Sequence, residues 1–170
     1  MQEAFQAEEN NDKTQIILLK GNGRHFCAGA DISEMKEFPR ESLASLLQQM
    51  VSFSKPIVAL TQGSTLGGGI GLLACSDIVI SYPDARFGFP ESKIGLAPVV
   101  IRPYVVAAIG ERAARYYFLT AEHFTASEAY RLGLVHQIGE SEEKALSCIQ
   151  ILLNNKFNSL LEIKRIMRDK

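Results

Sequence analysis

The sequence lacks an excess of charge of either sign. Its 18 lysines and arginines are balanced by 19 acidic residues, which leaves a formal net charge of −1. A chain without a basic block does not carry the electrostatic footprint of a nucleic-acid-binding protein. Arg112, Arg115 and Arg131 lie fairly close together in sequence, and we interpret them as solvated residues on helix faces. We therefore expect no nucleic-acid partner.

Cysteine is scarce, and the apolar runs are short. Cys27, Cys75 and Cys148 form an odd set without close spacing, which argues against a disulfide framework and against a metal site. Reduced thiols are typical of the cytosol or an organelle matrix, so we expect a cytoplasmic protein. No apolar run approaches the length of a membrane span, and the polar, acidic residues 1–15 do not resemble a signal peptide. We expect no membrane partner.

The residues that are present predict one α/β domain over residues 1–170. Hydrophobic residues make up 46% of the chain, which is enough for a substantial core. Strand and helix patterns alternate in the first half, and helices dominate the second half, an order typical of α/β architecture. The predicted strands are 14–20, 57–61, 77–81, 85–89 and 135–138; the predicted helices are 42–54, 67–75 (after a glycine-rich turn), 99–108, 111–119, 126–132, 141–154 and 159–169.

The first motif of chemical interest is HFCAGADI at 25–32. Small residues allow a backbone to approach a ligand closely, and Gly29 can adopt a conformation that other residues resist. The N–H group of a neighbouring residue would then point outward. Taken alone, this segment favours a tight strand-to-helix turn without a ligand.

The second motif is the triple glycine 67–69, directly before an apolar helix. The first N–H groups of a helix are unpaired and carry partial positive charge, so an anion or oxyanion site is the natural functional reading. Close helix–strand packing is the structural alternative. A nucleotide loop fits poorly, because no βαβ unit frames the glycines and no Gly-Lys-Ser/Thr sequence follows.

The third motif is FGFPE at 87–91, in which Glu91 follows apolar residues and a proline. A buried carboxyl group in this setting would have a raised pKa and would exchange a proton near neutral pH. An exposed turn glutamate, or a carboxylate near a helix N-terminus, is the alternative interpretation.

Taken together, these segments resemble the crotonase superfamily, also called the enoyl-CoA hydratase/isomerase family. The resemblance covers nearly the whole chain, in the order that the family shows. Five segments carry it: FCAGADI at 26–32, KPIVALTQGSTLGGGIGLLACSDI at 55–78, ARFGFPESKIGLAP at 85–98, GERAARYYFLT at 110–120 and SEAYRLGLVHQI at 127–138.

The resemblance implies a spiral of ββα units over about residues 14–138 and C-terminal helices over about 139–170, shortened at both ends relative to the family. It implies that an acyl-CoA thioester is the substrate, with no further cofactor. The thioester oxygen would accept hydrogen bonds from the N–H groups of Ala30 and Gly68. Glu91 would be the catalytic acid–base group, and the further substrate-binding residues would be Ala28, Ile32 and Gly67.

One position departs from the family pattern. Hydratases of this family commonly use a second glutamate just past the triple glycine, and here that position is Gly71. Hydration with Glu91 as the sole carboxylate is our first expectation. Double-bond isomerisation, which in this family needs only the Pro-Glu carboxylate, is the first alternative. A non-catalytic acyl-CoA-binding or scaffold subunit is the second.

Within the family, residues 92–122 are similar to bacterial hydratases of methylglutaconyl-CoA and isohexenylglutaconyl-CoA. Such substrates carry a second carboxylate, so a cation near the acyl end is expected, with Arg102 and Lys93 as the candidates. Surface positions are the alternative for both side chains. The resemblance also implies a place in leucine degradation and a homo-oligomer, either trimer or hexamer.

Overall fold

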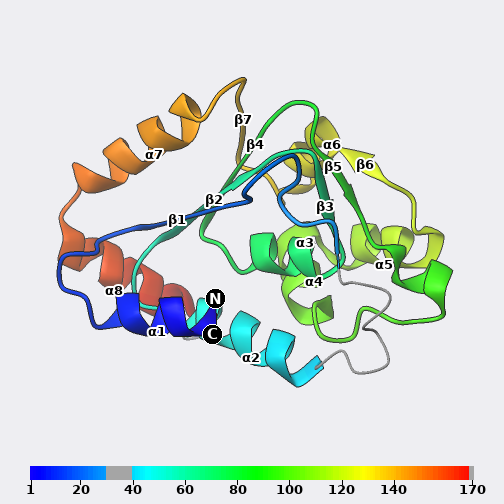
Figure 1. Cartoon of the computed structure of the whole chain (residues 1–170), viewed down its shortest axis with the longest axis horizontal. Helices are drawn as coiled ribbons and strands as arrows, with labels where there is room; N and C mark the ends of the chain where they lie inside the picture. The colour runs from blue at the N-terminus through cyan, green and yellow to red at the C-terminus, as the bar shows by residue number, and fades with distance from the viewer. Residues whose placement is uncertain (30–39, 169–170) are drawn as a thin grey trace.

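The computed structural model describes residues 1–29 and 40–168, and its core is a four-stranded parallel sheet (Figure 1). The strand order is β1-β2-β4-β7. These strands are β1 (Ile17–Lys20), β2 (Ile57–Thr61), β4 (Ile78–Ser81) and β7 (Gln137–Ile138). Every residue of β2 is buried, which is why its sequence reads as a continuous apolar run rather than an alternating one.

A second, three-stranded sheet continues from the first. It comprises β3 (Ser64–Leu66), β5 (Arg86–Gly88) and β6 (Phe124–Thr125), with β3 and β5 parallel and β5 and β6 antiparallel. The chain passes twice from a strand of the first sheet to a strand of the second and then into a helix. This repetition gives the expected ββα spiral.

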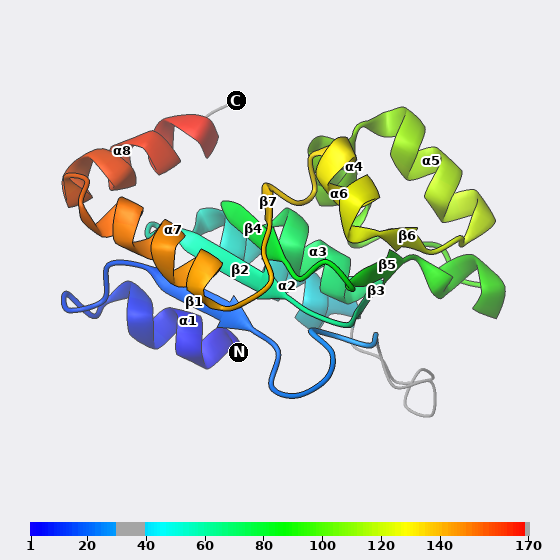
Figure 2. The same cartoon turned by 90° about the horizontal axis from the view of Figure 1, so that it is seen from above.

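Helices cover both faces of the first sheet and surround the second. In Figures 1 and 2, α1 and α7 lie on opposite sides of the first sheet, and α4, α5 and α6 gather around the second. The helices are α1 (Gln2–Glu9), α2 (Arg40–Ser52), α3 (Gly68–Ala74), the 3-10 helix η2 (Pro90–Ile94), α4 (Arg102–Ile109), α5 (Glu111–Thr120), α6 (Ala126–Leu132), α7 (Glu143–Leu153) and α8 (Phe157–Arg168).

The alternating side chains of β2 divide the core into two parts. Ile57 and Ala59 belong to a large cluster that includes residues of α1, α2 and α3, whereas Val58 and Leu60 pack with α7. No helix in the part of the chain that the structure describes is long and apolar enough to cross a membrane. The same residues contain no cluster of metal-ligating side chains.

Four predicted helix starts, those of α2, α4, α7 and α8, differ from the structure by two or three residues, and two of the differences have a clear physical reason. Helix α2 begins at Arg40, so Ser42 lies inside the first turn and is not its N-cap; Arg40 and Glu41 are good helix formers, and an acidic first turn is favourable. Helix α4 begins at Arg102 rather than at 99. Proline lacks an N–H, so Pro103 is favourable in the first helical turn but would interrupt a helix that began four residues earlier.

An ion pair between buried Lys164 and the more exposed Asp77 joins α8 to the amino end of the first sheet. Lys164, 8% exposed, donates from Nζ to Asp77 Oδ2 and to the Lys55 carbonyl, each at 2.7 Å. Asp77 Oδ2 also accepts a bond from the Ile57 N–H at 2.7 Å. Asp77 therefore braces its loop and joins α8 to β2.

Candidate active site

Parallel pairing of β3 with β5 brings the second and third motifs together. Leu66 lies opposite Gly88, and the Gly67 N–H donates to the Gly88 carbonyl at 3.0 Å. Three residues beyond Gly88, the Glu91 side chain returns to the triple glycine. Its Oε1 is 2.9 Å from the point where a Cβ on Gly67 would lie. The catalytic carboxylate predicted from sequence therefore adjoins the start of α3.

Gly68 is the first residue of α3, and its N–H has no acceptor within the described part of the chain. Such a group at a helix start has no intrahelical partner and is available to an oxygen of a ligand. Leu43 of α2 lies over Gly68, because a Cβ built there would approach Leu43 Cδ2 to 3.2 Å. An apolar side chain thus lies beside one of the two predicted oxyanion donors.

The first loop lies along β3. Cys27 forms a parallel bridge with Thr65, and the Leu66 N–H donates to the Cys27 carbonyl at 2.9 Å. Gly29 has a φ of +100°, the conformation for which glycine was expected there. Ala28 is exposed. The predicted donor Ala30 and the predicted substrate contact Ile32 lie outside the described residues.

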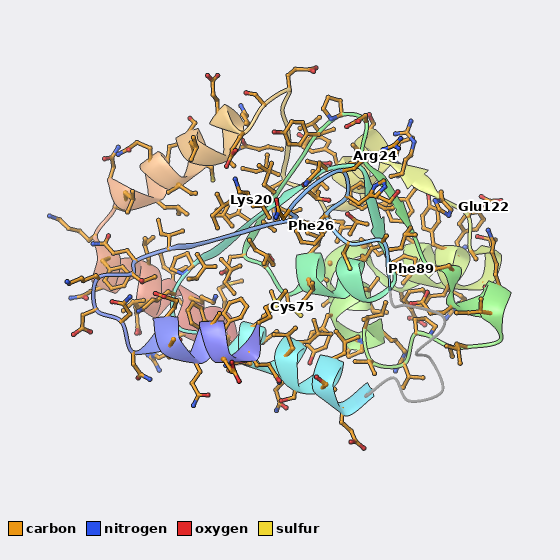
Figure 3. All side chains as sticks on the ribbon, in the orientation of Figure 1. Lys20, Arg24, Phe26, Cys75, Phe89 and Glu122 are labelled. Carbon is orange, nitrogen blue, oxygen red and sulfur yellow. The ribbon has the colours of Figure 1, made fainter. Side chains whose placement is uncertain are left out.

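Glu91 is half-buried, and one of its carboxylate oxygens is shielded from solvent. Oε2 is buried without a hydrogen-bond partner among the described residues, and burial raises the pKa of Glu91 above its ordinary value. Phe89, fully buried between the second sheet and α5 (Figure 3), packs edge-to-face against Phe118 with ring centroids 4.7 Å apart. A carboxyl group with a raised pKa takes up and releases a proton at a higher pH than an exposed glutamate does, as a general acid–base group requires.

The position of the family's second carboxylate is filled by apolar side chains. A Cβ on Gly71 would lie 2.6 Å from Ile101 Cγ2 and 3.3 Å from Leu47 Cδ1. Ile101 itself is 2% exposed. A side chain at position 71 therefore has no space unless Ile101 moves, and the site as described is built around one carboxylate.

The two cations expected at the acyl end are at the surface. Arg102 opens α4 and Lys93 lies in η2, and both side chains are exposed. Two surface cavities, of about 730 and about 610 Å³, lie elsewhere, one between α1 and α2 and one at the carboxyl ends of β1, β2 and β4. Neither is lined by any predicted site residue.

Sequence reasoning missed the apolar residues beside the glycines, namely Leu43, Leu47 and Ile101. Leu43 and Leu47 are four residues apart in a predicted helix, so their shared face was recoverable from helical periodicity. Ile101 had no such signal, because it was assigned to a helix that begins only at the next residue.

The model of the family described as enoyl-CoA hydratase/isomerase matches residues 1–170. The chain belongs to the enoyl-CoA hydratase/isomerase family. The crystal structure of an enoyl-CoA hydratase from Shewanella pealeana superposes with a TM-score of 0.93 at 38% identity, covering 98% of this chain and 67% of that one. These findings establish the family and its fold.

Two curated relatives have names that state a reaction. The 2,3-dehydroadipyl-CoA hydratase of Escherichia coli is 30% identical over 81% of this chain, and the short-chain-enoyl-CoA hydratase of Clostridium acetobutylicum is 33% identical over 79%. The chain spans 56% and 55% of the lengths of these two relatives.

Proposed function

We propose that this chain hydrates the double bond of an enoyl-CoA thioester, with Glu91 as its acid–base group. The observation that carries this proposal is the buried, unpartnered Glu91 Oε2 beside the triple glycine. Two curated relatives named as hydratases support the choice of hydration.

In the proposed reaction, Glu91 takes a proton from water as the water oxygen bonds to the β-carbon. The electrons of the double bond move toward the thioester, whose oxygen becomes an enolate oxygen. The N–H groups of Gly68 and Ala30 meet that charge without reorganising, and loss of one such donor costs about 3 kcal/mol of barrier. Glu91 then returns the proton to the α-carbon, so that one molecule of water has been added.

Isomerisation of the double bond is the second candidate, and Ile101 favours it. Because Ile101 fills the space beside Gly71, the site offers no second carboxylate there to hold an attacking water. A single glutamate suffices to move a proton between two carbons of the acyl chain. The same enolate would form, with the proton of Glu91 coming from substrate carbon instead of water.

We propose a short or branched acyl group, with methylglutaconyl-CoA as the leading candidate and leucine degradation in the cytoplasm as the setting. The name of the E. coli relative also specifies an acyl group that ends in a carboxylate. Arg102 or Lys93 would bind that carboxylate, and the protein would act as a trimer or hexamer. Neither nucleic acid nor membrane is part of the proposal.

The test is a substrate panel of crotonyl-CoA, 3-hexenoyl-CoA and 3-methylglutaconyl-CoA, with wild-type protein and Glu91→Gln. We expect Glu91-dependent loss of the conjugated double bond. Migration of the 3-hexenoyl double bond without hydration of crotonyl-CoA would establish isomerisation instead. A gain in thermal stability with CoA, but no turnover of any thioester, would identify the non-catalytic binding subunit.

A further inference from the structure

The carboxylate of Glu91 occupies the space that a side chain on Gly67 would fill. A Cβ built on Gly67 would lie 2.9 Å from Oε1, 3.5 Å from Cδ and 3.9 Å from Oε2. These are the three nearest atoms to that point, and all belong to Glu91. Because non-bonded carbon and oxygen atoms do not approach to 2.9 Å without strain, alanine at position 67 and this carboxylate position exclude each other.

The backbone of Glu91 is fixed on both sides, so a steric conflict at Gly67 would be relieved by rotation of the Glu91 side chain away from the glycine. On one side, the Gly67 N–H bonds to the Gly88 carbonyl, and the following Phe89 is fully buried. On the other, the Glu91 carbonyl accepts a bond from the Leu96 N–H at 2.9 Å. The meeting of Glu91 with Gly67 is therefore a consequence of strand pairing and of the short helix η2.

Oε2 of the carboxylate is buried without a hydrogen-bond partner in the described part of the chain. The only donor that acts on the pKa of this carboxyl is the backbone N–H of Glu91 itself, so no side chain of another residue orients it. A side chain on Gly67 would begin 2.9 Å from Oε1. A methyl group at this position would therefore displace the carboxylate and change the direction in which Oε2 points.

We propose that Gly67 is a positioning residue for Glu91, whose missing side chain admits the carboxylate to the start of α3 with Oε1 against Gly67 and Oε2 free for proton transfer. The placement rests on geometry alone, and its catalytic meaning rests on the proposed function. Gly67 was expected to bind substrate, but its N–H already donates to the Gly88 carbonyl.

The experiment compares Gly67→Ala with Gly110→Ala in the full chain. Both glycines have backbones that only glycine adopts readily, with φ and ψ of +50° and −117° at Gly67 and +77° and 156° at Gly110. A Cβ on Gly110 meets no described atom within 4 Å, so this control carries the backbone cost without the steric conflict.

We expect the NMR titration of the Glu91 carboxyl to move to lower pH in Gly67→Ala, because the displaced group regains water, and to stay in place in Gly110→Ala. We also expect kcat to fall on the order of 10²-fold in Gly67→Ala, as for other small misplacements of a catalytic group, with KM nearly unchanged. A Glu91 titration that stays in place or rises in Gly67→Ala would overturn the proposal.

The Glu91→Asp background gives an independent check. Aspartate is one methylene shorter, so its carboxylate withdraws from Gly67. Adding Gly67→Ala to Glu91→Asp should lower kcat by a much smaller factor than Gly67→Ala does in the wild type. Equal losses in both backgrounds would show that Gly67 acts only through backbone strain. If the wild type turns over no thioester but the Glu91 titration still moves in Gly67→Ala, the proposed function is refuted while the placement of the carboxylate is supported.

Discussion

At the scale of single residues, the site depends on glycines whose absent side chains leave room for chemistry. Gly68 tests the oxyanion proposal, because its contribution is an N–H group and open space. We predict that Gly68→Val lowers kcat by at least about 10²-fold, since the valine methyl groups block the oxygen that would accept the bond. Turnover of the enoyl-CoA panel measures the effect, with circular dichroism as the check on folding.

Leu43 provides the control for this variant, because a Cβ on Gly68 approaches its Cδ2 to 3.2 Å. Adding Leu43→Ala relieves that contact and should recover stability but not turnover. Recovery of turnover in the double variant would mean that Gly68→Val had acted only through packing.

At position 71 glycine is required by packing, because Ile101 fills the space that a side chain would need. We predict that Gly71→Glu lowers the free energy of unfolding by at least about 1–3 kcal/mol from overpacking, and more from the buried charge. Urea unfolding measures the loss. Adding Ile101→Gly should return part of the stability by opening space, and a Gly71→Glu variant as stable as the wild type would contradict the packing that we describe.

Glu91 makes stability depend on pH, in a direction set by its raised pKa. The folded protein holds the Glu91 proton more tightly than the unfolded chain does, so this group favours folding at low pH. That contribution is lost as pH rises through the folded-state pKa. We predict that Glu91→Gln becomes increasingly stable relative to the wild type over this window, which lies above the ordinary value of about 4.3. Urea unfolding of both proteins between pH 4 and 8 tests it, and a constant difference would be contrary to this prediction.

At the scale of elements, the sequence predicted the buried strands and missed the short, partly polar ones. Residues 57–61 and 126–132 form a strand and a helix with the predicted bounds, because apolar runs and turn residues mark their ends. Strand β3 was missed, since two of its three residues are polar and its buried Thr65 is accommodated by a 2.6 Å hydrogen bond between its hydroxyl and that of Thr61. That bond depends on tertiary placement, which no local pattern reports.

The candidate site, too, was predictable only in part. The nearness of Glu91 to the triple glycine was implied by the order of the motifs within the family. The filling of the Gly71 position by Ile101 was not predictable, because the two residues are far apart in sequence and meet only through the late start of α4.

Helix α8 supplies a prediction at this scale. Lys164→Met keeps most of the buried stem but removes the ammonium, leaving the Lys55 carbonyl without that donor. We expect the free energy of unfolding to fall by about 1–3 kcal/mol. We also expect amide hydrogen exchange to speed up more in α8 than in β2, relative to the wild type. Lys156→Met, at an exposed lysine, is the matched control. Equal exchange in α8 for both variants would show that the ion pair does not fasten this helix.

At the scale of the whole molecule, α8 is oriented against the usual amphipathic pattern. Its lysine is buried, while Ile163, Ile166 and Met167 are 54%, 53% and 62% exposed. At helical spacing these three residues share one face, and Figure 2 shows α7 and α8 at the margin of the molecule. Exposed Leu146, Ile151 and Leu153 add further apolar surface on α7 and at its end. Exposed apolar side chains gathered on a helix face, as on α8, are typical of association faces.

We predict that the protein self-associates through this surface, in keeping with the proposed homo-oligomer, and that Ile163→Glu with Ile166→Glu shifts it to smaller species. The charged side chains would have to lose water in the interface, which opposes association without disturbing the buried Lys164. Leu119→Glu at the end of α5, 74% exposed, adds a charge to apolar surface elsewhere and should leave the association state unchanged. Sedimentation velocity over a range of concentrations distinguishes the cases. A wild type that stays monomeric, or a Leu119→Glu variant that dissociates as readily as the α8 variant, would show that α8 is not the face that joins the subunits.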